Sequence, residues 1–289
     1  MHQFRVFTFF LVLFSGSLLA QGSLEPANPP GPTMKTLDQV EARTPVSAPG
    51  TLSQAGSYYL TQDINGQIEI GADRIVLDLN GFSIHGANDN LLIQNRSDVI
   101  VHNGRISGSG NANVQIGSSS QIRLSDLTIN NANGGGAIQV FDPTGLIHLE
   151  RLNVIDNHLG ILISTSTEDD YEVVFKDNTV TGTSAASPAF SAGSNSTGHV
   201  QVTVSGNRVF SNGGVGISFN ANAATSSGVI SNNFVSNNTS TGLSASGDMV
   251  VVRNVAQDNG PNYILGSAPN AAPVSSVGSS PGAWDNISQ

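Results

Sequence analysis

Residues 122–163 read IRLSDLTINNANGGGAIQVFDPTGLIHLERLNVIDNHLGILI, and the second half of this stretch repeats the aliphatic pattern of the first. Within each half, aliphatic residues come in pairs with one residue between them, which is the spacing of a strand with one buried face. The Gly, Asn, Asp and Ser residues between the pairs are typical of turns. Each repeat therefore predicts three short strands, and the pairs are Ile122/Leu124, Leu127/Ile129 and Ile138/Val140, then Ile147/Leu149, Leu152/Val154 and Ile161/Ile163.

The same repeat extends along most of the chain. One aliphatic position recurs at intervals of about 20 to 29 residues, inside the range that indicates a solenoid. Stacked repeats pair each strand with its copy in the next repeat and so form three parallel sheets around one core. The sequence thus predicts an all-β fold, a single right-handed parallel β-helix of about eight or nine coils, with the handedness of parallel crossovers in general. The recurring residues are Ile84, Ile106, Ile129, Val154, Val180, Val209, Val235 and Val255.

A column of asparagines lies two residues before this recurring position in three successive repeats, as Asn178, Asn207 and Asn233. At this position the side chain points into the coil. Stacked amides can donate to and accept from one another. We therefore expect an internal asparagine ladder with a structural role, in preference to a polar functional site.

The first twenty residues have the features of a secretory signal. Arg5 supplies a positive charge, residues 6–14 form an apolar run, and Ala20 is a small residue suited to a cleavage site. The run is too short for a comfortable membrane span. We expect an exported protein, periplasmic or extracellular, without a membrane span.

The rest of the chain is expected to form one domain with flanking segments. Met34, Leu37 and Val40 are three residues apart, which predicts a short helix with one apolar face. Such a helix would cap the N-terminal end of the core. The predicted organisation is a signal peptide at 1–20, a Pro-rich linker at 21–32, an N-terminal cap at 33–55, the parallel β-helix at 56–266 and a C-terminal tail at 267–289.

Composition restricts the possible partners. The formal net charge is -10, and nucleic acid is not an expected partner because binding it requires a basic surface. A polyanionic sugar would need a local cluster of cations or a bridging metal ion. The chain has no cysteine, so disulfides are excluded. We expect a monomer.

Several segments resemble a family of exported bacterial right-handed β-helix proteins with the pectate-lyase-like fold. They are LDQVEARTPV at 37–46, GSYYL at 56–60, LDLNGF at 77–82 and NYILG at 262–266, together with Trp284. The resemblance implies the fold and export, and it implies no activity. Pectate lyases, polygalacturonases, alginate epimerases and passive surface proteins share this fold, so the fold does not choose among them.

Charged residues recur at one outward position in the central repeats. Asp126, Arg151 and Asp177 come three residues before the recurring aliphatic position in consecutive coils. Neighbouring coils are about 4.8 Å apart, so these residues are expected to be in contact, first of all as structural ion pairs. With Arg123 they form the predicted binding residues.

A functional interpretation of the same region gives the catalytic candidates. Arg151 and His148, with Asp156 and His158, would line one groove together with Arg123. An arginine can hold a carboxylate and a histidine can act as a base. A histidine at a strand end, such as His158, more commonly belongs to a turn.

Glu168, Asp169 and Asp170 form the densest acidic segment and are weak candidates for a metal site. A lyase or epimerase acting on uronates needs a base and a cation that neutralises the carboxylate. Calcium, the possible cofactor, would need several oxygen ligands. Adjacent acids on a loop more commonly face water.

Three functional hypotheses remain open from the residues. The first is a carbohydrate-associated exported protein, with polysaccharide as its partner and no recognisable catalytic motif. The second is a polysaccharide lyase or uronate epimerase, and the third is a structural surface protein. The set of carboxylates that polygalacturonases use is absent, which disfavours hydrolysis.

Overall fold

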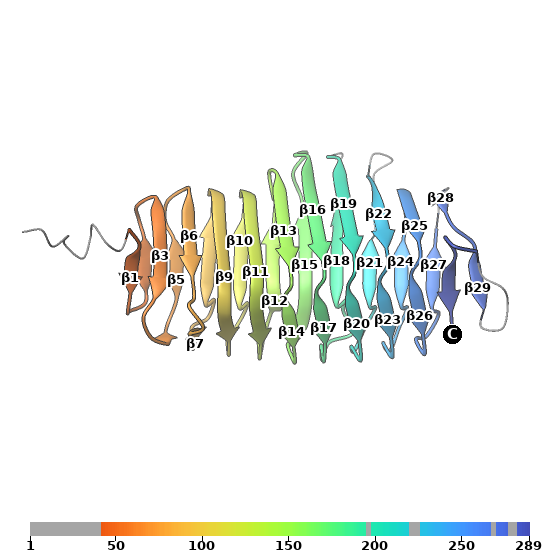
Figure 1. Cartoon of the computed structure of the whole chain (residues 1–289), viewed down its shortest axis with the longest axis horizontal. Helices are drawn as coiled ribbons and strands as arrows, with labels where there is room; N and C mark the ends of the chain where they lie inside the picture. Colours follow the sequence, from red (N-terminus) through yellow and green to blue (C-terminus); the bar gives the residue numbers. More distant parts are fainter. Residues whose placement is uncertain (1–41, 195–197, 220–225, 267–269, 277–281) are drawn as a thin grey trace, which may run out of the picture. The chain divides into compact units, whose positions relative to one another are not determined.

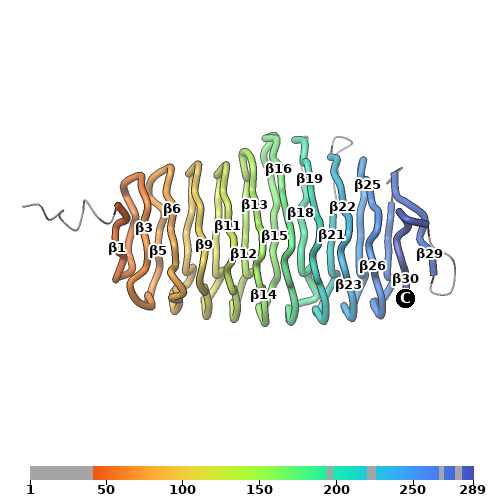
Figure 2. Tube along the Cα trace, viewed as in Figure 1, coloured from red at the N-terminus to blue at the C-terminus, as the bar shows by residue number. Residues whose placement is uncertain are grey.

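The structure is a computed structural model. It describes residues 42–194, 198–219, 226–266, 270–276 and 282–289. Short parallel strands are the regular secondary structure of these residues. Residues 43–289 form one unit, and within it the coils follow one another in chain order (Figures 1 and 2). The predicted signal peptide, linker and capping helix lie outside the described residues. Within the described residues, no helix is long and apolar enough to cross a membrane.

One strand from each coil contributes to a parallel sheet that we name sheet 3. Its ten strands in the described residues are paired in chain order. They are β2 (Gly50–Leu52), β5 (Ile68–Ile70), β8 (Leu91–Gln94), β10 (Val114–Gly117), β12 (Gly136–Phe141), β15 (Leu159–Thr165), β18 (Phe190–Ser194), β21 (Ile217–Phe219), β24 (Leu243–Ala245) and β27 (Tyr263–Leu265).

The other strands form one continuous sheet that bends at a corner in every coil. We name the half before the corner sheet 1. It contains β1 (Thr44–Val46), β3 (Gly56–Leu60), β6 (Ile75–Asp78), the first parts of β9 (Ser97–Ser107) and β11 (Ser120–Asn130), β13 (Leu146–Glu150), β16 (Tyr171–Lys176), β19 (Val200–Ser205), β22 (Ser227–Ser231), β25 (Asp248–Val252) and β28 (Asn270–Ala271).

The half after the corner is sheet 2. It contains β4 (Ile64–Asn65), β7 (Ser83–His85), the last parts of β9 and β11, β14 (Asn153–Ile155), β17 (Thr179–Thr181), β20 (Arg208–Phe210), β23 (Phe234–Ser236), β26 (Val255–Gln257), β30 (Asn286–Ser288) and its neighbour β29 (Val274–Ser276). The predicted three-sheet parallel solenoid is thereby confirmed. Strand pairing also reaches into the segments expected to be cap and tail, because β1 pairs with β3 and β30 pairs with β26.

The core lies inside the coils and is built from the aliphatic pairs. In one coil, Ile122, Leu124, Ile129, Ile138 and Val140 are all fully buried. Their partners in the next coil are again aliphatic and buried, so apolar side chains stack along the solenoid without interruption. Removal of this surface from water is the main favourable term for the fold.

The register of two coils differs from the sequence-based expectation. Val235 pairs with Ala256, and Val255 instead lies on the outer face, so the last member of the recurring series is Ala256. Val255 and Ala256 are adjacent and both apolar, so the repeat pattern allowed either of them to be the inward residue. At the other end, alignment of the repeats would pair Leu77 with Val99, but Leu77 pairs with Val101, which places Asp78 beside His102.

The corner between sheets 1 and 2 has left-handed backbone in coil after coil. This explains its Asn, Asp and Gly residues, which adopt positive φ most easily. Arg151 and Arg253 occupy the same corner, with φ of 52° and 57°. The predicted outward column of charges is therefore a column of corner residues, namely Asn103, Asp126, Arg151, Asp177, Gly206, Asn232 and Arg253.

The predicted asparagine ladder is confirmed and continues beyond the predicted residues. The Nδ2 of each amide donates to the Oδ1 of the next, at 2.9–3.0 Å, along Asn178, Asn207, Asn233, Asn254 and Asn286. A second ladder, which the sequence analysis missed, runs along Asn212, Asn238, Asn259 and Asn262 at the end of sheet 2. Both ladders satisfy backbone groups where the coils turn.

Candidate functional site

A nearly buried carboxylate lies on the outer face of sheet 1. Glu150 ends β13, and its register neighbours are Ser125 in β11 and Lys176 in β16. Its side chain is only 10% exposed, although it points away from the core. Basic side chains from its own coil and from both neighbouring coils cover it.

Four basic groups surround the Glu150 carboxylate. Arg123 Nη2 is 2.6 Å from Oε2, and Arg151 Nη1 is 2.5 Å from Oε1. His148 Nε2 lies 3.6 Å from Oε2, and Lys176 Nζ lies 4.0 Å from Oε1. Two charge-assisted contacts and two longer approaches thus converge on one acid, which offsets the cost of its burial.

Two further acids lie at the edge of this arrangement. Arg151 makes two hydrogen bonds to Asp126, as the repeat spacing predicts. The Arg151 guanidinium holds the pKa of the Asp126 carboxyl below its usual value, chiefly through these hydrogen bonds. Asp177 approaches Lys176, with Nζ and Oδ2 at 3.8 Å. We name these seven residues the charged cluster: Arg123, Asp126, His148, Glu150, Arg151, Lys176 and Asp177.

The charged cluster is electrically balanced at neutral pH. Three permanent cations face three carboxylates, and the remaining member is His148. Burial lowers the pKa of this histidine, and the nearby charge of Arg123 lowers it further. Its Nε2 is buried without a hydrogen-bond partner among the described residues. The imidazole is therefore neutral at pH 7, and this nitrogen cannot reach a ligand in this conformation.

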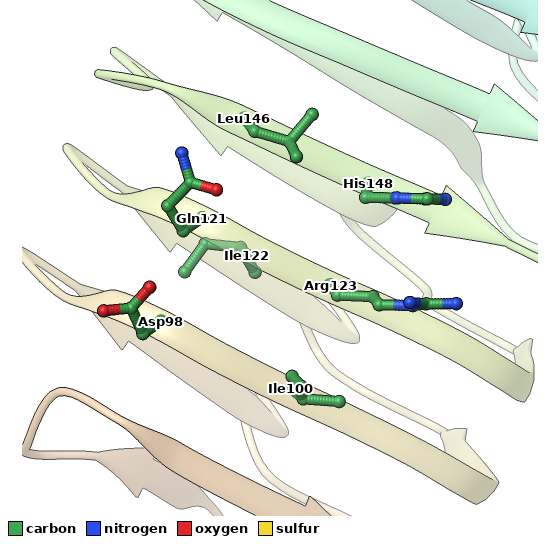
Figure 3. A pocket seen from close by; sticks show the side chains of 7 residues that line it. All are labelled: Asp98, Ile100, Gln121, Ile122, Arg123, Leu146 and His148. Atoms are coloured by element: carbon green, nitrogen blue, oxygen red, sulfur yellow. The ribbon is translucent and has the colours of Figure 1, made fainter.

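A shallow depression of about 260 Å³ adjoins the charged cluster. Arg123 and His148 extend side by side from adjacent strands along it, and Asp98 and Gln121 lie at its other side (Figure 3). Ile100 and Leu146, with Ile122, supply its apolar lining. The surface thus offers cationic donors next to aliphatic contacts.

Two predicted catalytic candidates lie away from this cluster. Asp156 follows β14 at the next corner, where its φ is 53°. His158 is exposed two residues later, and its Nδ1 lies 3.2 Å from Ser184 Oγ. The structure therefore brings together Arg123, His148 and Arg151, and it places Asp156 and His158 at the opposite end of sheet 2.

The acidic segment Glu168–Asp170 is an exposed connection between β15 and β16. Asp170 Oδ1 accepts a hydrogen bond from the backbone N–H of His199 at 2.7 Å. In the described part of the chain, no three His, Asp or Glu side chains are grouped so that they could hold a metal ion.

Glu150 and Lys176 were not among the predicted site residues. The sequence indicates them through a column of equivalent positions, one residue before the corner, that also contains His102 and Ser125. Opposite charges on adjacent coils of one column indicate contact. Nothing in the sequence pattern indicates that Glu150 is buried, because its burial depends on how side chains from three coils cover it.

A family model described as "Right handed beta helix region" matches residues 68–227, more than half of the chain and the part that carries the charged cluster. No curated protein matches the chain.

Proposed function

The chain belongs to the right-handed β-helix family, and from that premise we propose that it binds acidic carbohydrate at the charged cluster on the outer face of sheet 1. The observation that carries the proposal is the gathering of three permanent cations, Arg123, Arg151 and Lys176, with His148 beside them, on three neighbouring coils of a chain with a net charge of -10. An acidic protein repels a polyanion except where cations are concentrated.

Two of these cations retain donors for a ligand. The Arg123 side chain is 44% exposed, and one nitrogen of its guanidinium contacts Glu150. A guanidinium carries five N–H donors, enough to hold a second carboxylate. Lys176 is 49% exposed, and its ammonium stands 3.8–4.0 Å from the nearest carboxylate oxygens, beyond normal hydrogen-bond distance.

The spacing of the coils suits a chain of sugar units. Arg123, His148 and Val174 occupy the same position in consecutive coils about 4.8 Å apart. Ile100 precedes Arg123 in this column. A glycan lying along it would meet the Arg123 guanidinium and the His148 imidazole in the central coils and aliphatic side chains on either side. Sugar rings have both polar edges and apolar faces, and this surface offers both kinds of contact.

A uronate lyase is the second candidate, and it is favoured by the position of His148 beside Arg123 at the depression, where burial lowers the pKa of the imidazole. In such a reaction a base removes the proton next to the carboxylate, a carbon–carbon double bond forms, and the glycosidic C–O bond breaks as its oxygen takes up a proton. The buried Nε2 does not suit this role. Binding without cleavage is therefore the leading proposal, and export would bring the chain to extracellular polysaccharides.

Titration calorimetry with polygalacturonate and alginate oligomers tests the proposal, with neutral cello-oligosaccharides as the control ligand and arms with and without calcium. Binding of the acidic oligomers should weaken with added salt and fall at least tenfold in Arg123→Ala. Arg105→Ala is the matched control, because Arg105 is an exposed arginine of β9 on sheet 2, outside the charged cluster.

Equal binding of neutral oligomers, or undiminished binding by Arg123→Ala, would overturn the proposal. Absence of binding to every oligomer would leave the charged cluster with a structural role only. If absorbance measurements on the same mixtures detect unsaturated uronate, the lyase is favoured instead.

A further inference from the structure

Arg253 and Trp284 form a stacked pair at the C-terminal coils. The guanidinium carbon of Arg253 lies 3.8 Å from the centroid of the Trp284 ring, and the Trp284 residue is 60% exposed. The backbone N–H of Arg253 donates to the Trp284 carbonyl, and its Nε donates to the Ala283 carbonyl, each at 3.1 Å. Two side-chain contacts and one backbone hydrogen bond therefore hold Arg253 against an indole that remains largely open to solvent.

Among the described residues, no carboxylate forms an ion pair with Arg253. Arg151 occupies the same left-handed corner four coils earlier and is bound by two carboxylates. The ion pairs among the described residues include neither Arg253 nor Arg208. The nearby carboxylate of Asp285 is occupied by Ser275 Oγ and the backbone N–H of Gly282.

Arg208 and two phenylalanines lie on the adjoining part of sheet 2. Arg208 pairs in register with Phe234, and Phe234 pairs with Val255, which is two residues after Arg253. The Arg208 guanidinium also lies over the Phe210 ring, at 5.8 Å. Two arginines without an ion-pair partner among the described residues thus flank partly exposed aromatic rings across one corner of the solenoid.

We propose that Arg208, Phe234, Arg253 and Trp284 form a second contact site for acidic carbohydrate, which we name the C-terminal platform. A sugar ring stacks on the Trp284 indole, and Arg253 and Arg208 each receive the single carboxylate of a uronate unit in the same glycan chain. The inference rests on the proposed function, and it names a site separate from the charged cluster.

The chemistry of the four residues favours an acidic sugar. An indole presents a flat apolar face that matches the C–H face of a pyranose, and its N–H can meet a hydroxyl. A guanidinium binds a carboxylate through two parallel hydrogen bonds. Stacking on Trp284 orients Arg253 before a ligand arrives, so less side-chain entropy is lost on binding. In the charged cluster, by contrast, every permanent cation already faces a carboxylate.

Trp284 is the only tryptophan of the chain, so intrinsic tryptophan fluorescence reports on this site alone. The full chain is titrated with polygalacturonate oligomers and followed both by fluorescence and by calorimetry. We expect a saturable change in fluorescence with the same midpoint as the heat signal. Arg253→Ala should weaken binding about tenfold, Arg253→Lys should weaken it less, and Arg105→Ala should bind as the unaltered protein does.

The outcomes separate this inference from the proposed function. Heat without any fluorescence change, with Arg253→Ala binding normally, would overturn the C-terminal platform and leave the charged cluster in place. A fluorescence change that depends on Arg253 but not on Arg123 would support the platform and overturn the cluster as the binding site. Equal responses to neutral cello-oligosaccharides would overturn the acidic ligand class. Because Arg253→Ala could disturb the corner, Arg253→Gly, which suits positive φ, must give the same loss of binding.

Discussion

Arg151 binds Asp126 of the preceding coil through two parallel hydrogen bonds, from Nε to Oδ1 at 2.7 Å and from Nη2 to Oδ2 at 2.8 Å. The same guanidinium contacts Glu150 with its third nitrogen. Arg151 does this from a left-handed backbone, with φ of 52°. The side-chain contacts therefore act against an unfavourable local conformation.

This opposition predicts different effects for two replacements of Arg151. Arg151→Ala and Arg151→Gly both remove the ion pairs, but only glycine relieves the positive φ. We expect the glycine variant to be more stable than the alanine variant by about 1 kcal/mol. Chemical denaturation measures the difference in unfolding free energy. Equal stabilities would show that the corner is not strained.

Glu150→Gln should strengthen the binding of acidic oligosaccharides. The replacement keeps the shape of the side chain and removes the charge that faces Arg123, Arg151 and Lys176. The charged cluster then carries a net positive charge, so we expect affinity for polygalacturonate oligomers to rise several-fold at low salt. Calorimetry gives the affinity. Unchanged or weaker binding would contradict a carboxylate-binding role for these cations.

Stability should depend on pH through His148. Burial lowers the pKa of His148 in the folded chain, whereas the unfolded chain titrates near its ordinary value of about 6.5. The unfolded state therefore binds more protons below about pH 6.5, and stability falls as pH decreases through this window. The charged groups facing His148 are Arg123, Glu150, Arg151 and Lys176.

His148→Gln should flatten this part of the stability profile, measured as thermal midpoint against pH. His158→Gln is the control, since His158 is exposed and lies outside the charged cluster. If the thermal midpoint has the same pH dependence in the His148→Gln variant as in the unaltered protein, a group other than His148 takes up the proton on unfolding.

Asn207→Ala should be strongly destabilising. Asn207 Oδ1 accepts from the backbone N–H and from Nδ2 of Asn178, and its Nδ2 donates to Phe175 O and Asn233 Oδ1. Truncation leaves several buried polar groups unpaired, at about 1–3 kcal/mol each. We expect a loss of at least about 3 kcal/mol.

Asn153→Ala provides the matched control for this loss, because Asn153 is exposed on the outer face of β14. We expect its effect to stay within about 0.5 kcal/mol. Urea denaturation of both variants makes the comparison. A small loss for both would mean that water replaces the ladder amide.

The repeat made much of the fold predictable. Residues one repeat apart become neighbours, so any contact at that spacing can be expected before the structure is known. The contact of Asp126 with Arg151 and the ladder from Asn178 to Asn233 are of this kind. The register of the coil that contains Val255 and Ala256 could not be predicted in this way, because either residue fits an inward position.

By itself, the sequence determined the strand periodicity, the parallel three-sheet solenoid and the column partners in the central coils, because burial of alternating aliphatic residues favours one arrangement of these repeats. Only the tertiary structure decided that Glu150 is buried beneath arginines from two coils and that His148 Nε2 is enclosed beside it. It also decided that Trp284 lies against Arg253. Trp284 lies beyond the segment in which the sequence predicted the repeat, so no spacing indicated its neighbour, and it is placed by the pairing of β30 with β26 and β29.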